Sequence, residues 1–119
     1  MIAGIGVDLF ETRRFRKFRT NLDFLSQIFS ASEIKRMEKP PRNLYPPAVF
    51  FAVKEATRKA LGKGLNPGWF WRQIRIDPGL NIHLTKNIKR LVPRKNYKMI
   101  RAAVGRGRKF TLAFTVIEK

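Results

Sequence analysis

Two carboxylates and a lysine are the residues of this chain best suited to chemistry. Asp8 ends a run of small and apolar residues, and Glu55 lies in a helical pattern that continues to Lys59. The chain has 8 acidic residues against 26 basic ones, so carboxylates in apolar surroundings stand out. If the fold brings Asp8 and Glu55 together, they offer oxygen ligands for a hard cation, ringed by lysine and arginine. A magnesium-dependent enzyme acting on a phosphorylated substrate requires such a site.

Each of these residues also has a plainer interpretation. Glu55 and Lys59 have the i, i+4 spacing in the favourable order, which on a helix surface gives an ion pair worth about 0.2–0.5 kcal/mol. An aspartate at a strand end, such as Asp8, is often a helix cap or a turn former. The glycines at 62 and 64 lack the spacing of a Walker motif and predict no phosphate loop by themselves. Taken singly, none of these residues establishes a site.

The elements that must position these residues follow from the hydrophobic pattern. Residues 2–9 alternate as a strand, and Gly4 and Gly6 leave the Asp8 side of it without bulk, so a helix or ligand could approach closely. A proline pair at 46 and 47 predicts the start of a helix that runs to about Leu61 and ends at a glycine-rich segment. This predicts Asp8 at a strand end, with Glu55 and Lys59 on one helix.

The rest of the chain predicts short helices and antiparallel strands. Ser30 and Glu33 have the spacing of a capping box at the start of a helix. Helices are expected over 11–18, 21–29, 31–37 and 86–91, and strands over 74–76, 82–84, 99–104 and 109–117. The last two strands form a hairpin. With no repeat or linker, residues 1–119 predict one α+β domain in which an antiparallel sheet packs on a long helix.

Composition narrows the classes of function. A length of 119 residues with 44% apolar content fits one domain with a real core. The absence of cysteine excludes disulfides, thiolate catalysis and cysteine-based zinc sites, and the single histidine, His83, argues against a histidine-rich metal site or a Ser-His triad. No apolar run approaches the roughly 20 residues of a membrane span. No signal peptide pattern opens the chain. We therefore predict a cytoplasmic protein without a membrane partner.

The formal charge of +18 calls for a polyanionic partner. No acidic residue lies between Asp77 and Glu118, and a second basic cluster covers residues 13–19. Such a field attracts nucleic acid, acidic proteins, anionic membranes or phosphorylated cofactors. Charge alone does not choose among them, and a basic surface without a single purpose stays open as an alternative.

Two motifs taken together resemble one family. The strand GIGVDL at 4–9 is followed by Glu11 and Arg14, and FAVKEA at 51–56 continues through Lys59 to GKG at 62–64. This pair resembles the holo-[acyl-carrier-protein] synthase family, the small trimeric 4′-phosphopantetheinyl transferases, over essentially the whole chain. The resemblance implies transfer of the phosphopantetheine arm of coenzyme A to a serine of an apo acyl carrier protein, with magnesium, releasing adenosine 3′,5′-bisphosphate.

The resemblance also implies roles for single residues. Asp8 and Glu55 match the magnesium ligands, and Glu55 could take the serine proton directly or through water. Lys59 matches the lysine that stabilises the transferring phosphoryl group. The implied coenzyme A site comprises Lys59, Gly62, Lys63, Gly64 and Arg106. The implied surface for the acidic carrier protein comprises Arg13, Arg14 and Lys17, extended by Arg16, with Arg14 acting across a subunit boundary of a homotrimer.

Three segments depart from the family pattern. Phe50 stands where the family usually has arginine, and residues 79–81 read Gly-Leu-Asn in place of Gly-Lys-Pro. Residues 103–106 read Ala-Val-Gly-Arg where the family usually has Ser-x-Ser-His, and Arg106 could replace the histidine as a partner of the 3′-phosphate. These changes concern nucleotide affinity. A catalytically weak relative that binds anionic partners therefore remains an alternative, and so does a basic nucleic-acid-binding module using aromatics near 69–71, although we expect nucleic acid to bind only non-specifically.

Overall fold

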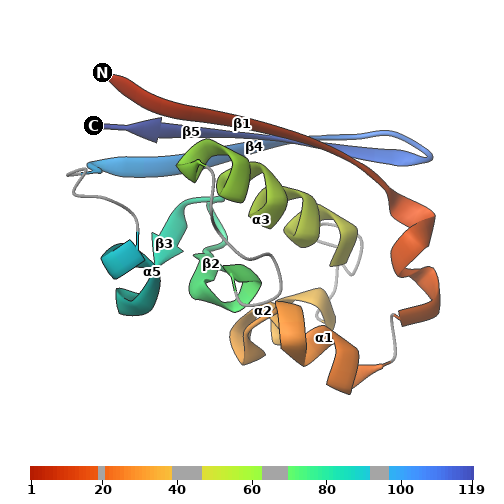
Figure 1. The fold of residues 1–119 in the computed structure, drawn as a ribbon. Coiled ribbons are helices and arrows are strands. Elements are labelled where there is room, and N and C mark those ends of the chain that lie inside the picture. Colours follow the sequence, from red (N-terminus) through yellow and green to blue (C-terminus); the bar gives the residue numbers. More distant parts are fainter. Residues whose placement is uncertain (19–20, 39–46, 63–69, 92–96) are drawn as a thin grey trace.

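Three antiparallel strands form the main sheet of the computed structural model, which describes residues 1–18, 21–38, 47–62, 70–91 and 97–119, without the side chains of 16–18, 38 and 91. The strand order is β1 (Ile2–Glu11), β5 (Phe110–Glu118) and β4 (Met99–Arg106), as Figure 1 shows. Asp8 lies opposite Ala113 of β5, and Ala113 lies opposite Val104 of β4. The two chain ends meet at one end of the sheet, where the backbone N–H of Lys119 donates to the carbonyl of Met1 at 2.8 Å.

The long helix α3 (Pro47–Leu61) lies along one face of this sheet (Figure 1). Its approach is so close that a Cβ atom on Gly6 would stand 1.8 Å from the carbonyl oxygen of Ala56. A Cβ atom on Gly4 would stand 2.4 Å from the carbonyl oxygen of Ala60, one helical turn further on. The glycine side of β1 is therefore the side that receives the helix, as the sequence pattern predicted. Asp8, next in this row, comes to lie beside the part of α3 that carries Lys59.

A second layer covers the side of α3 away from the sheet (Figure 1). It contains the 3₁₀ helices η1 (Thr12–Phe18) and η2 (Trp71–Gln73), the helices α1 (Leu22–Ile28), α2 (Ala31–Glu38) and α5 (Lys86–Leu91), and the two-stranded sheet of β2 (Ile74–Ile76) and β3 (Ile82–Leu84). Phenylalanines fill the space between this layer and α3; Phe10, Phe15, Phe29, Phe50 and Phe70 are buried. This aromatic core anchors α3, because the helix contributes Phe50 and most of its other buried residues to it.

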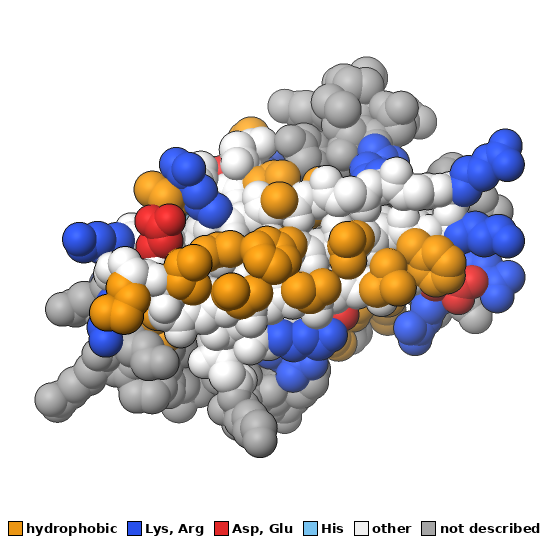
Figure 2. All heavy atoms as spheres, turned by 90° about the horizontal axis from the view of Figure 1, so that it is seen from above, with side chains coloured by type: hydrophobic (Ala, Val, Ile, Leu, Met, Phe, Trp, Pro, Cys, Tyr) orange, Lys and Arg blue, Asp and Glu red, His pale blue; other side chains and the backbone are white. Residues whose placement is uncertain are grey.

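The other face of the main sheet is apolar and exposed. Figure 2 shows a continuous band of hydrophobic side chains across it. The band contains Ile2, Ile5, Val7, Leu9, Met99, Phe110, Leu112 and Phe114, each at least 38% exposed. Isolated apolar residues on a surface need no explanation, but a contiguous apolar patch marks a surface that associates. Alternation predicted a common face for Ile5, Val7 and Leu9, and the structure shows that this face is exposed while the core lies on the side of Gly4, Gly6 and Asp8.

The predicted fold class is confirmed: helices and an antiparallel sheet pack on the long helix. The capping box is confirmed as well, since Ser30 Oγ accepts from the Glu33 amide at 3.2 Å and Glu33 Oε1 accepts from the Ser30 amide at 2.9 Å. The helix predicted over 11–18 is a 3₁₀ helix that begins at Thr12, because β1 continues to Glu11. Within the described ranges, no helix is long and apolar enough to cross a membrane.

Candidate active site

Asp8 is held beside α3 by Lys59. Lys59 Nζ donates to Asp8 Oδ1 at 2.9 Å and to the carbonyl oxygen of Val7 at 3.2 Å. The Asp8 side chain is only 12% exposed. Its second oxygen, Oδ2, is buried and has no hydrogen-bond partner among the described residues. A buried carboxylate oxygen without a partner is costly unless a ligand completes it.

Glu55 projects from α3 and is held by two donors. Arg58 Nη2 donates to Oε2 at 2.8 Å, and Trp71 Nε1 donates to Oε1 at 2.6 Å. The Glu55 side chain is 12% exposed, comparable to Asp8. Trp71 comes from η2, so two distant segments of the chain meet at this carboxylate. Glu55 is therefore an ordered, largely buried acid.

Arg58 connects the two acids electrostatically. Its hydrogen bonds to Glu55, followed by the charges of Glu55 and Asp8, raise the pKa of the Arg58 guanidinium above its usual value although partial burial opposes this. Both carboxylates thus lie within the influence of one cation at one edge of α3. The surface ion pair between Glu55 and Lys59 that the spacing suggested is absent from the described ion pairs. Lys59 turns to the sheet, which offers it the Asp8 carboxylate and a backbone carbonyl, while Glu55 takes the nearer Arg58 and the indole.

The donor set at this edge fits a hard divalent cation. Mg²⁺ is commonly bound by one or two carboxylates, with water and substrate phosphate completing its six oxygen ligands. Asp8 and Glu55 supply two carboxylates from different elements, and Asp8 Oδ2 is the unused buried oxygen that such an ion would complete. Lys59 adds a positive charge suited to a phosphate on the same side.

The other residues with a predicted role lie at the end of α3, across the sheet, in η1 or outside the described part of the chain. Gly62 follows α3 with a φ of 110°, a left-handed conformation that suits glycine. Lys63 and Gly64 lie outside the described residues. Arg106 ends β4 opposite Thr111, on the same sheet face as Asp8 but two strands across. Lys17 lies in η1, and its side chain is not among those described.

The first basic cluster is exposed where it is described. Arg13 pairs with Glu11, and the Arg14 guanidinium stacks over the ring of Phe10, 5.2 Å from its centroid. Both arginines remain accessible to solvent. They occupy η1, directly after the strand that carries Asp8, so a partner bound to them would lie at the Asp8 end of the site.

The three departures from the family pattern fall in different parts of the fold, and residues 79–81 lie in the turn between β2 and β3, where Leu80 has a positive φ of 61°. Phe50 is buried, 1% exposed, and lies under the Arg36 guanidinium, 5.4 Å from its ring centroid. Ala103 and Gly105 pair with Phe114 and Leu112, so they lie on the outer apolar face of the sheet. This face is opposite to the one that carries α3. Ala103 and Gly105 therefore face away from α3 and Glu55, whereas Val104 between them lies on the α3 side.

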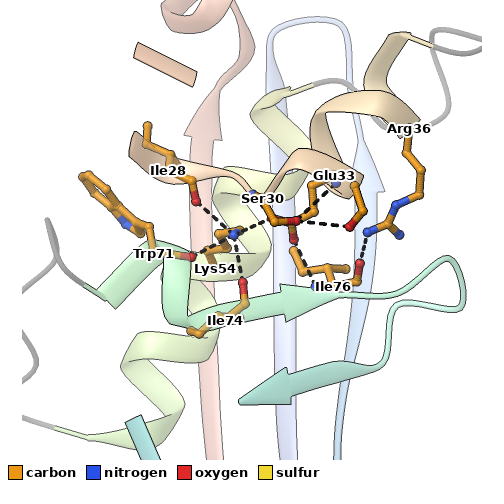
Figure 3. Close-up of polar contacts among 9 residues, drawn as sticks. Ile28, Ser30, Glu33, Arg36, Lys54, Trp71, Ile74 and Ile76 are labelled. Carbon is orange, nitrogen blue, oxygen red and sulfur yellow. Dashed lines mark hydrogen bonds and ion pairs between the residues drawn. The ribbon is translucent and has the colours of Figure 1, made fainter. Parts of the chain in front are cut away.

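Sequence reasoning missed the buried charges behind the site. Lys54, adjacent to Glu55, is completely buried, and its Nζ lies within hydrogen-bond distance of Glu33 Oε1 at 2.8 Å and of three carbonyl oxygens, those of Ile28, Trp71 and Ile74, at 2.7–3.0 Å (Figure 3). Burial lowers the pKa of Lys54 to about 8, against the opposing effect of Glu33. The sequence offered only a weak indication of this pair, namely a lysine within an apolar helical run. Its partner, the capping-box glutamate, lies 21 residues away along the chain.

Comparison with known proteins assigns the class. Residues 4–115 match the 4′-phosphopantetheinyl transferase superfamily, so the chain belongs to that class of protein. The holo-[acyl-carrier-protein] synthase of Bartonella bacilliformis is 32% identical over 128 residues, covering 99% of this chain and 96% of that protein. That of Clostridium perfringens (strain SM101 / Type A) is 33% identical over 127 residues, covering 99% and 95%.

Solved structures agree with the sequence relatives. The Helicobacter pylori holo-[acyl-carrier-protein] synthase in complex with coenzyme A has a TM-score of 0.74 and 27% identity, covering 96% of this chain and 99% of that one. The Bacillus anthracis holo-(acyl-carrier-protein) synthase, solved in complex with CoA (3′,5′-ADP), has a TM-score of 0.69 and 26% identity, covering 100% and 98%. The chain belongs to the holo-[acyl-carrier-protein] synthase family and is an enzyme of that family.

Proposed function

We propose that this protein transfers the 4′-phosphopantetheine arm of coenzyme A to a serine of an apo acyl carrier protein, with Mg²⁺, and releases adenosine 3′,5′-bisphosphate. The observation that carries the proposal is the arrangement of two carboxylates, Asp8 and Glu55, beside α3. One buried oxygen of Asp8 has no hydrogen-bond partner among the described residues, and Lys59 pairs with the other. The coenzyme A and nucleotide complexes of the two solved relatives support a nucleotide donor.

The residues of the edge have distinct tasks in this proposal. Asp8 and Glu55 hold the metal ion, which when bound neutralises charge on the pyrophosphate of coenzyme A. Lys59, fixed by Asp8 and the Val7 carbonyl, directs its ammonium at the transferring phosphoryl group, where charge is redistributed in the transition state. Glu55 accepts the proton of the attacking serine, directly or through water. The bond that forms joins the serine oxygen to the β-phosphorus of coenzyme A, and the bond that breaks frees the adenosine bisphosphate.

Two groups of basic residues bind the substrates in this proposal. Arg13, Arg14 and Lys17 of η1 meet the acidic carrier protein. Two observations support this role for the basic residues. Arg13 and Arg14 are exposed next to the strand that carries Asp8, and the net charge of +18 attracts an acidic partner. Gly62, Lys63, Gly64 and Arg106 receive the nucleotide. The left-handed Gly62 at the end of α3 supports a close backbone approach there.

We also propose that the enzyme is a homotrimer built on the outer face of the main sheet. This face is a contiguous apolar band, and it continues into a hollow lined by Met99, Arg101, Ala103, Phe114, Val116 and Glu118. A second argument comes from the segment at 103–106 that departs from the family pattern, in which Ala103 and Gly105 lie on this face and away from α3. Assembly through the band would bring that segment of one protomer to the site of another. Closed assembly would also cover the apolar surface on every subunit.

The direct test is the modification of a carrier protein. Purified enzyme, coenzyme A and Mg²⁺ should convert an apo acyl carrier protein into a product heavier by the phosphopantetheine mass, and chelation of the metal should stop the reaction. Asp8→Ala and Glu55→Ala should each lose the product. Failure with several carrier proteins would reject the proposal in favour of a catalytically weak relative that binds anionic partners. Retention on nucleic acid that falls with salt is expected in either case, because the chain is strongly basic.

A further inference from the structure

The Glu55 carboxylate is fixed by folding before any ligand arrives. Both of its oxygens accept hydrogen bonds, from the Trp71 indole at 2.6 Å and from the Arg58 guanidinium at 2.8 Å. A glutamate side chain on a helix surface otherwise samples several rotamers, and ordering it costs conformational entropy. Here folding already orders the Glu55 side chain, because its two donors set the direction of the carboxylate before a ligand binds.

Trp71 is itself held from behind. Its backbone carbonyl accepts from Lys54 Nζ at 2.7 Å, and its ring packs against Phe51 with centroids 5.3 Å apart. Figure 3 shows the Lys54 amine between the Trp71 carbonyl and the Glu33 carboxylate. Glu33 is tied in turn to β2, because its Oε2 accepts from the backbone amide of Ile76 at 3.0 Å. A continuous set of contacts therefore runs from β2 through Glu33, Lys54 and Trp71 to Glu55.

The two donors on Glu55 act differently toward an incoming cation. Arg58 carries a full positive charge that acts on both Glu55 and Asp8, so a metal ion must compete with it. The indole N–H of Trp71 is neutral and leaves the negative charge of Glu55 intact. Oε1 also accepts from Arg58 Nε at a long 3.4 Å, and because each carboxylate oxygen has two lone pairs, Oε1 can keep the indole bond and coordinate a metal once Arg58 leaves.

We propose that Trp71 is a positioning residue of the metal site: it orients Glu55 for the cation, whereas Arg58 is the cation that the metal displaces. The inference rests on the metal site proposed above. Partners that hydrogen-bond a metal-ligating carboxylate tune the site, and their loss typically weakens metal affinity about 10–100-fold. The indole of Trp71 is such a partner of Glu55, so its loss should weaken metal binding. The guanidinium of Arg58 competes with the metal through its charge, so its loss should strengthen metal binding.

The test measures metal binding as well as activity. Mn²⁺ serves as the probe for the full chain in the presence of coenzyme A, and the free ion is counted by its electron paramagnetic resonance signal. Trp71→Phe keeps an aromatic ring to pack on Phe51 and removes the indole N–H donor together with the five-membered ring; it should weaken Mn²⁺ binding about tenfold. Arg58→Gln should strengthen binding. An unchanged affinity in Trp71→Phe, or a weaker one in Arg58→Gln, would overturn the proposal.

Activity separates positioning from general support of the fold. Excess Mn²⁺ should restore the turnover of Trp71→Phe toward that of the wild type. A low turnover that no metal concentration restores would show that the indole supports the structure instead. Asp8→Ala tests the underlying metal site: if it binds Mn²⁺ like the wild type, the proposed metal site is wrong, whatever Trp71 does.

A second measurement needs no substitution at position 71. Trp69→Phe leaves one tryptophan in the chain, so the remaining indole N–H resonance belongs to Trp71. Saturating Mg²⁺ with coenzyme A should shift this resonance, because its acceptor becomes a metal ligand, and the proton should stay protected from exchange. A resonance unaffected by saturating Mg²⁺, or a proton that begins to exchange freely, would contradict the positioning role.

Discussion

Replacing Gly6 by alanine tests how the fold creates the site. The new Cβ atom would stand 1.8 Å from the carbonyl oxygen of Ala56 and 2.7 Å from the backbone nitrogen of Ala60. Both obstacles are helix backbone, so no flexible side chain can move aside. An ordinary contact between a carbon and a carbonyl oxygen is about 3.3 Å or longer, so β1 and α3 must separate by about 1.5 Å.

The cost of this separation follows from the packing around it. Overpacking a well-packed core typically costs about 1–3 kcal/mol, and a clash with backbone belongs at the upper end. We expect Gly6→Ala to lower the free energy of unfolding by about 3 kcal/mol. With a urea dependence of about 2 kcal/mol per molar, the unfolding midpoint should fall by about 1.5 M. The same movement would stretch the 2.9 Å contact between Lys59 and Asp8 beyond hydrogen-bond range. A displacement near 1 Å can cost about a hundredfold in rate, and we expect a loss of that order.

The assay is urea unfolding followed by circular dichroism at one protein concentration for all variants, since assembly would make the midpoint depend on concentration. Gly107→Ala is the matched control, because a Cβ atom there would meet only the Phe110 carbonyl oxygen at an ordinary 3.6 Å. It should unfold close to the wild type. If Gly6→Ala unfolds at the same urea concentration as Gly107→Ala and retains full activity, the close approach of strand and helix does not position the site.

Lys54→Met should destabilise the protein by about 3–5 kcal/mol in the same assay, because it leaves Glu33 as an unpaired buried charge; the double variant Glu33→Leu/Lys54→Met should lose less. Burial would raise the pKa of Asp77, but hydrogen bonds from His83 and two turn amides outweigh it and keep the pKa below 3.8. Its stabilisation should be present above pH 3.8 and fade as the pH falls further, so the stability advantage over Asp77→Asn should narrow between pH 5 and pH 3; a constant difference would refute this. If the proposed trimer forms, Leu112→Asp should convert it to monomers by light scattering, and a wild-type monomer would contradict the proposed assembly.

The fold was predictable where local pattern and packing point the same way. The row of Gly4, Gly6 and Asp8 predicted the strand side that receives a helix, and the proline pair and glycine ending bounded that helix. The capping box at Ser30 and Glu33 was also readable, because its two partners are three residues apart. These features depend on spacing within a single element, which a sequence displays directly.

The contacts of the site were less predictable, because they depend on how distant elements dock. Arg58 and Lys59 both have spacings from Glu55 that allow an ion pair. Because Asp8 on β1 pairs with Lys59, Glu55 is left to pair with Arg58. The indole of Trp71 reaches Glu55 only because η2 lies against α3. Lys54 resembled a surface residue, since lysine is almost never fully buried unless it is paired. Its partner lies 21 residues away along the chain.

The buried pair of Glu33 and Lys54 restricts how this sequence can change over generations. Replacing either residue alone leaves a charge or a set of carbonyl groups unsatisfied inside the protein, so each single step passes through a poorly folded intermediate. The two positions should therefore change together or not at all. Arg58, partly exposed at 26%, has no such constraint and is free to vary. If the proposed metal site is correct, metal affinity can thus be adjusted at position 58 while positions 33 and 54 stay fixed.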